Sequence, residues 1–289
     1  MIGIELVREV IESVILTGRV RGIYPASLLL IATPESGKTS VVLAKDCKNV
    51  KAFTDVTGNG ILKIVKQMPD LTHIVINDMV AVLSHRGSVN KHTVSTLNAM
   101  TEEGVNCIST PGGIEEFPEG KRGVIASLTT DLVADSRNWW NKIGFTTRMI
   151  PFCYKYPDDL VLKIKDSIDA HAATGRDKKE PRKETFGTPK DRKYVRYPPS
   201  VIEEVRRIAD YRAMVIGETG LRRLKQYHAL VQGHALLRSF TNPEVNNQDV
   251  EFLKQVDMFI SYDIPRALEP PRRFELTPEL AQEVTSVSV

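Results

Sequence analysis

The residues with the clearest chemical pattern form the segment ATPESGKT, residues 32–39. It lies between a short apolar run and a helical pattern, which is the context of a phosphate-binding loop. Backbone N–H groups of such a loop, with the positive end of the following helix, wrap a β-phosphate. Lys38 would reach the β- and γ-phosphates, and the Thr39 hydroxyl would bind Mg²⁺. The expected ligands are therefore ATP and Mg²⁺, bound by Ala32, Thr33, Pro34, Glu35, Ser36, Gly37, Lys38, Thr39 and Ser40.

A phosphate loop of this kind works with an acidic residue at the tip of a neighbouring strand, which holds the Mg²⁺ shell and orients water. The segment THIVINDM, residues 72–79, supplies Asn77 and Asp78 after an apolar run. Two registers are open. Either Asn77 occupies the metal position and Asp78 acts as the base, or Asp78 is the metal ligand and Met79 occupies the base position. ATP hydrolysis is expected as well as ATP binding, although in either register one of the two positions holds a residue that is not an acid, Asn77 or Met79.

The elements that would position these residues follow from the apolar pattern. Residues 27–32, 72–76 and 123–128 are short apolar runs, typical of central strands in a mostly parallel sheet. Helical patterns over residues 37–45 and 90–103 alternate with them, which predicts a layered α/β domain. After residue 197 the patterns predict helices alone, over residues 201–212, 220–240 and 247–259.

Charge divides the chain in the same way. Residues 174–197 contain nine Lys/Arg and four Asp/Glu, a net charge of +5, whereas the rest has 30 against 32, a net charge of −2. We expect a nucleotide-binding core over residues 1–173, a basic linker over 174–197, a helical lid over 198–262 and a poorly ordered tail over 263–289. No apolar run is long enough to span a membrane. The widely spaced Cys47, Cys107 and Cys153 predict buried or neutral thiols in a reducing cytoplasm.

Further motifs follow the phosphate loop in order: LNAMTEEGVNCIS at residues 97–109, VIASLTT at 124–130, KIGFTTRMIPFCYKYPDDL at 142–160 and TGLRRLKQYHALVQGHALLRSF at 219–240. Together they resemble the AAA+ ATPases of the branch that contains the minichromosome-maintenance helicases and the MoxR-type ATPases. The likeness extends over residues 10–261. It implies an AAA+ core with a five-stranded, mostly parallel sheet, an all-helical lid, and assembly of identical chains into a ring, expected to be a hexamer.

The resemblance also implies roles for single residues. Thr129 matches the sensor-1 residue, which contacts the γ-phosphate and the attacking water. Arg148 matches the arginine finger, which reaches the ATP of the neighbouring subunit and neutralises charge on the γ-phosphate. Arg222 matches the sensor-2 arginine, with Arg223 as the near alternative. His228 and His234 are six residues apart, so they do not share a helix face and are expected to pack or meet solvent.

The target of such an ATPase stays open between three functions. The basic linker and the lid resemblance favour a helicase-like motor or loader acting on DNA. The expected hairpin favours a remodeller of protein complexes, because Pro111 stands at its tip with Glu115 and Glu116 close behind. Lys121 and Arg122 are expected on its returning side. Asn77 favours a third function, a nucleotide-gated assembly switch with weak hydrolysis.

Overall fold

The computed structural model describes residues 4–34, 36, 38, 45–46, 48–110, 113–174, 184–185, 188, 191–216 and 220–268. Its centre is a parallel sheet of six strands in the order β10-β8-β1-β7-β4-β3. The strands are β1 (Leu28–Ala32), β3 (Val50–Phe53), β4 (His73–Ile76), β7 (Gly123–Leu128), β8 (Ile150–Lys155) and β10 (Arg266–Ala267). The three apolar runs are thus confirmed as strands, and the protein is an α/β protein.

The expectation of five strands is wrong by one, because β10 joins the sheet beside β8. Arg266 pairs with Tyr154, Leu268 N–H donates to the Lys155 carbonyl over 3.0 Å, and the Leu268 side chain is buried. Residues 263–268 of the tail predicted over 263–289 lie within the described part of the chain. Residues 269–289 lie outside the described part of the chain.

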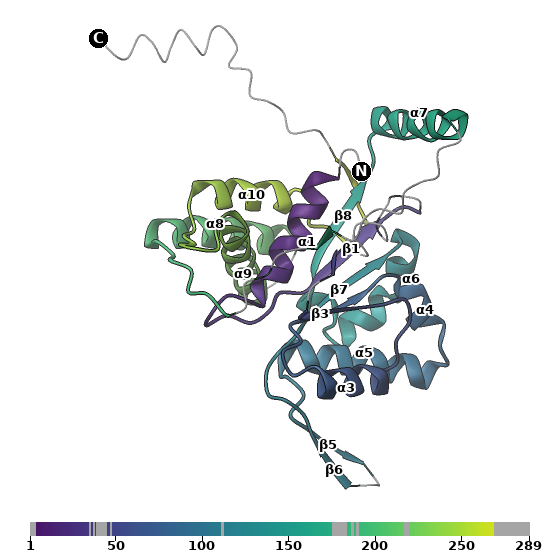
Figure 1. Ribbon diagram of the computed structural model, residues 1–289, viewed down its shortest axis with the longest axis vertical. Coiled ribbons are helices and arrows are strands. Elements are labelled where there is room, and N and C mark those ends of the chain that lie inside the picture. The colour runs from purple at the N-terminus through teal and green to yellow at the C-terminus, as the bar shows by residue number, and fades with distance from the viewer. Residues whose placement is uncertain are drawn as a thin grey trace, which may run out of the picture.

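Two apolar layers enclose the sheet. Along β1, Leu28 and Leu30 pack into one layer, and Leu29 and Ile31 pack into the other, because successive side chains of a strand point to opposite faces. One face is covered by α1 (Glu5–Thr17) and by the lid helices α8 (Pro199–Ile216), α9 (Leu221–Arg238) and α10 (Asn247–Asp257). The other face is covered by α3 (Gly58–Gln67), α4 (Met79–Ser84), α5 (Gly87–Glu102) and α6 (Thr130–Lys142). Figure 1 shows the lid helices gathered beside α1.

Two segments extend from this body (Figure 1). The antiparallel hairpin of β5 (Cys107–Thr110) and β6 (Gly113–Glu116) projects beyond α3 and α5. Helix α7 (Asp158–Thr174) extends from the end of β8. Much of the basic linker that follows α7 lies outside the described residues, as does most of the helix expected over 37–45. The described part includes a short parallel pair, β2 (Lys45–Asp46) with β9 (Glu184–Thr185).

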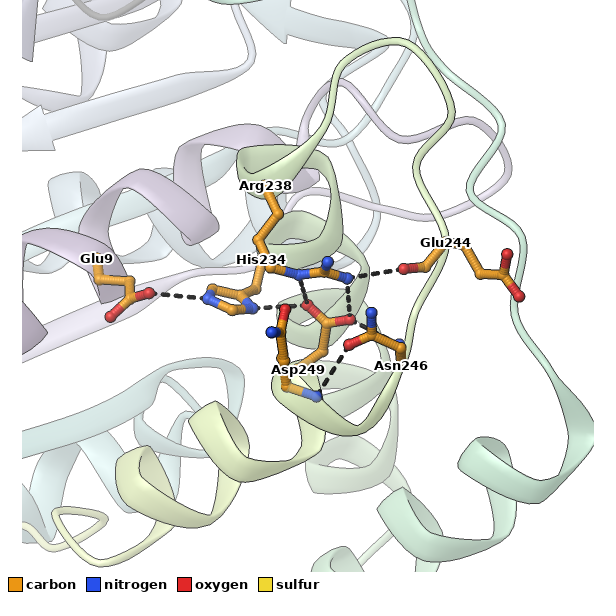
Figure 2. Close-up of polar contacts among 7 residues, drawn as sticks. Glu9, His234, Arg238, Glu244, Asn246 and Asp249 are labelled. Atoms are coloured by element: carbon orange, nitrogen blue, oxygen red, sulfur yellow. Dashed lines mark hydrogen bonds and ion pairs between the residues drawn. The ribbon is translucent and has the colours of Figure 1, made fainter. Parts of the chain in front are cut away.

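The lid is joined to α1 by close packing and by a charged network (Figure 2). A Cβ atom at Gly233 of α9 would lie 2.2 Å from the Ser13 carbonyl oxygen of α1, so the two helix backbones nearly touch. At the next position along α9, His234 is buried between two carboxylates, with Nδ1 2.6 Å from Asp249 and Nε2 2.9 Å from Glu9. Its ring stacks on Phe252 at 4.0 Å between centroids.

The same network closes the start of α10. Arg238 donates two hydrogen bonds to Asp249, of 2.9 and 2.6 Å, and the Asn246 N–H donates a third over 2.7 Å. Asn246 also caps α10 through its own side chain, so a capping box begins this helix. The other lid histidine, His228, is hydrogen-bonded to the Tyr197 hydroxyl.

Among the described helices, none is long and apolar enough to cross a membrane.

Candidate functional site

The segment expected to bind phosphate lies at the carboxyl end of β1, the strand that joins the two halves of the sheet. Thr33 and Pro34 are exposed there, whereas Ser36 is buried. Lys38 is helical, in agreement with a loop that leads into a helix. Four of the expected ligand residues lie outside the described residues: Glu35, Gly37, Thr39 and Ser40.

The Lys38 ammonium group is folded onto its own loop. Nζ donates to the carbonyl oxygens of Ala32 and Thr33 over 2.9 and 2.7 Å, and to Ser36 Oγ over 3.1 Å. Burial lowers the pKa of Lys38, and the negative charge of Asp78 opposes that shift. An ammonium group has three protons, and these neutral acceptors use all of them. A phosphate oxygen would be a stronger acceptor than any of the three, because it is charged.

Asn77 and Asp78 differ sharply in their surroundings, although they are adjacent at the end of β4. Asn77 is 4% exposed. Its backbone N–H donates to the Phe53 carbonyl, and its backbone carbonyl accepts from the Ser127 hydroxyl. Asp78 is exposed and caps α4, accepting from the Val80 N–H over 2.9 Å. Both residues therefore stand at the same edge of the sheet as Lys38.

The side-chain oxygen of Asn77 has no hydrogen-bond partner among the described residues, although it is fully buried. Leaving a buried acceptor unpaired costs about 1–3 kcal/mol, so such an atom usually has a ligand or water as partner. An amide oxygen is a hard ligand suited to Mg²⁺ or to a water bound to it. Asn77 thus fits a Mg²⁺ ion. Among the described residues, no group of three or more His, Cys, Asp or Glu could by itself hold a metal.

Thr129 follows β7, which lies between β1 and β4 in the sheet. Its hydroxyl accepts from the Leu132 N–H over 3.4 Å and caps α6. A capping hydroxyl accepts through a lone pair and still has its own proton to donate. The strand order therefore brings Thr129 between the loop and the Asn77–Asp78 pair.

Arg148 and Arg222 lie together at the opposite edge of the sheet. Arg148 ends the short helix η1 (Thr146–Arg148) before β8, whose first residue, Ile150, pairs with the first residue of β1. The length of β1, about 13 Å, thus separates this edge from the phosphate loop. Arg222 reaches the same place from α9, donating to Thr147 Oγ1 over 2.7 Å.

Glu102, at the end of α5, holds both arginines. Its carboxylate lies 3.2 Å from Nε of Arg148 and 3.6 Å from NH2 of Arg222. Burial, and then the charge of Arg222, lower the pKa of Arg148. The Arg148 side chain is 16% exposed and that of Arg222 is 44% exposed. Arg148 also donates to the Gly144 and Ile143 carbonyls of its own chain, so it is mostly buried here, whereas Arg222 is partly exposed. Both arginines lie at an edge of the sheet that their own loop does not reach.

Arg223 lies in the interior of the protein, where it holds neighbouring groups in place. It is buried and donates to the side-chain oxygen of Gln226 over 2.8 Å, beneath the start of β8. Between the two candidate lid arginines, Arg222 is the one that solvent or another molecule can reach.

The hairpin carries acidic rather than basic side chains. Glu115 and Glu116 are exposed on β6, and Ile114 beside them is 75% exposed. Lys121 lies 4.0 Å above the ring of Tyr24, and Arg122 is buried, donating to the Pro118 and Gly120 carbonyls. The expectation that Lys121 and Arg122 line the returning side of the hairpin is wrong, because β6 ends at Glu116 and the two residues pack against the body. The expected tip residue, Pro111, lies outside the described residues.

Two residues of the site carry no signal in the sequence. Glu102 is one of two adjacent glutamates at a helix end, and nothing in its spacing points to two arginines. The Tyr154 hydroxyl donates to the Ser36 carbonyl over 3.2 Å, although 118 positions separate the two.

No protein-family model matches the chain, and a comparison with curated proteins finds no match.

Proposed function

We propose that this chain is a Mg²⁺-dependent ATPase of the AAA+ type, which hydrolyses ATP at the contacts between identical subunits of a ring, with a hexamer as the expected size. One observation carries the proposal. Lys38, Asn77, Asp78 and Thr129 share one edge of the sheet, whereas Arg148 and Arg222 share the opposite edge. An arginine that stabilises the γ-phosphate of another copy has to lie at such a distance from its own loop.

The chemistry assigns a separate task to each side chain. Lys38 exchanges its neutral loop acceptors for β- and γ-phosphate oxygens. Asp78 accepts the proton of a water that attacks the γ-phosphorus, the bond to the β–γ bridging oxygen breaks, and ADP and phosphate leave. The Thr129 hydroxyl donates to the γ-phosphate or the water. Arg148 and Arg222 of the neighbouring copy neutralise the charge that develops.

Asn77 would hold Mg²⁺ or one of its waters, and the ion would neutralise part of the phosphate charge. We assign Asn77 to the metal side, because its unpaired amide oxygen is buried at the strand end, and Asp78 to the water. This order agrees with the first of the two registers considered above. A neutral amide in the metal position attracts a cation less than a carboxylate does, so slow hydrolysis, as in an assembly switch, is part of the proposal.

The experiment is a mixing assay between two inactive variants. ATP hydrolysis per chain should rise steeply with protein concentration, and Arg148→Ala should lower turnover about 10³-fold or more while ATP binding persists. A mixture of Arg148→Ala with Lys38→Ala should regain activity, since one supplies the loop and the other the finger. Arg206→Ala, which removes an exposed arginine of α8, is the control and should hydrolyse normally. A mixture that co-assembles and stays inactive refutes catalysis between subunits.

We propose that the target is nucleic acid, which the basic residues of the linker would bind. We also propose that the protein is cytoplasmic. The exposed acidic side chains of β6 favour a second candidate, a protein complex, because they would repel a phosphate backbone. ATPase rates with and without single- and double-stranded DNA, at two salt concentrations, separate the two. An ATPase rate that DNA raises, and raises less at high salt, supports the first candidate, and a rate that neither form of DNA changes at either salt concentration supports the second.

A further inference from the structure

The Tyr154 hydroxyl is the polar end of an aromatic row inside the protein. Tyr154 lies on β8, opposite Ala32 of β1, and its side chain is fully buried. The ring centroid of Phe152 lies 5.9 Å from that of Tyr154, and Phe152 stacks on Phe259 at 4.9 Å. These contacts fix the ring, so the hydroxyl is held in one place below the phosphate loop.

The hydroxyl donates to the backbone carbonyl of Ser36 over 3.2 Å. Burial raises the pKa of Tyr154, so its hydroxyl keeps its proton and can donate it in a hydrogen bond at neutral pH. The side chain of the same serine accepts from Lys38 Nζ over 3.1 Å. Ser36 therefore joins the tyrosine to the lysine that is expected to meet phosphate.

The direction of this hydrogen bond matters for anion binding. A loop that binds phosphate has to turn its N–H groups toward the anion and its carbonyl oxygens away, because a carbonyl oxygen carries negative charge. The hydrogen bond from the buried Tyr154 hydroxyl holds the Ser36 carbonyl toward the protein interior, and so removes its negative charge from the side on which an anion would bind.

We propose that Tyr154 is a positioning residue of the phosphate loop, which turns the Ser36 carbonyl inward and so aligns the loop for the phosphates of a nucleotide. The inference rests on the proposed function. Tyr154 does not touch the nucleotide; it acts through Ser36. Because the loop holds the phosphates equally in the ground state and in the transition state, losing this alignment should raise KM and leave kcat nearly unchanged.

The test is Tyr154→Phe, which removes one oxygen atom and keeps the ring contacts with Phe152. Affinity for a fluorescent ATP analogue should fall about 3- to 10-fold, the usual effect of one neutral hydrogen bond, with KM rising by the same factor and kcat within about two-fold of wild type. The control is Tyr156→Phe, which removes a half-buried hydroxyl two residues further along and should leave the affinity unchanged.

A purely structural hydroxyl would lower the melting temperature without changing the KM-to-kcat pattern. Unchanged affinity and KM in Tyr154→Phe, or an equal loss in Tyr156→Phe, overturns the inference while the proposed function stands. A wild-type protein that binds no ATP overturns the proposed function, and the inference with it.

Discussion

The contact between α1 and α9 offers a quantitative test, because Gly233 brings the two backbones together. The Cβ of Gly233→Ala would lie 2.2 Å from the Ser13 carbonyl oxygen, 3.0 Å from Thr17 Cγ2 and 3.1 Å from the Ser13 carbonyl carbon. The closest ordinary carbon–oxygen contact is about 3.3 Å, so the helices would have to separate by about 1 Å. The atoms in the way belong mostly to a helix backbone, which cannot rotate aside as a side chain does.

The expected loss of stability combines two opposing effects. Overpacking of this kind costs about 1–3 kcal/mol, with the upper end appropriate where backbone has to move. Alanine in a helix interior is about 1 kcal/mol better than glycine. The net loss is therefore about 2 kcal/mol, which for a chain of this size lowers the melting temperature by about 4–8 °C. A matched control is Gly87→Ala at the start of α5, where a Cβ would meet nothing within 4 Å and stability should stay equal or rise.

Thermal and urea unfolding of the two variants measure this difference directly. A second measurement is ATP turnover, since α9 also carries Arg222, and a shift of about 1 Å at a catalytic group can cost about 10²-fold in rate. ATP binding to the phosphate loop should persist in Gly233→Ala. A Gly233→Ala protein as stable as wild type, with Gly87→Ala behaving the same, would refute the close contact between α1 and α9.

Three further predictions concern single side chains. Lys38→Ala should abolish ATP binding, since a cation that faces the phosphates is lost, and wild-type affinity in an equilibrium binding assay would refute the phosphate loop. Asp78→Asn keeps a residue able to cap α4 but cannot accept a proton, so hydrolysis should fall about 10²- to 10⁴-fold with ATP still bound; normal turnover would exclude Asp78 as the base. Burial alone would lower the pKa of His234, but its hydrogen bonds to Asp249 and Glu9 outweigh burial and raise it. The stability this histidine supplies should therefore be complete below pH of about 6.5 and lost as pH rises through the higher folded-state pKa. Unfolding free energies of wild type and His234→Gln should converge at alkaline pH, and a constant difference across pH 6–9 would contradict the charged network.

The local sequence pattern was enough to predict the central strands of the sheet and the helices of the lid. The strands β1, β4 and β7 are short runs of apolar residues buried on both faces, and such runs have few alternatives in an α/β protein. The helices of the lid were predicted to within a few residues, because their caps and their apolar spacing are local properties. For the same reason the Asn77–Asp78 pair could be expected at a strand end, where it lies, and Lys38 could be expected in the helix that follows the loop after β1.

The tertiary structure decided what depends on distant contacts. β10 has two residues and joins the sheet only through its partner β8, so no pattern of its own could predict it. Adjacent arginines look alike in sequence, yet packing against the start of β8 buries Arg223 and leaves Arg222 at the surface. Glu102 and Tyr154 acquire their partners from other elements of the fold. A side chain's exposure and hydrogen-bond partners depend on which elements pack around it, and that packing is a property of the whole fold.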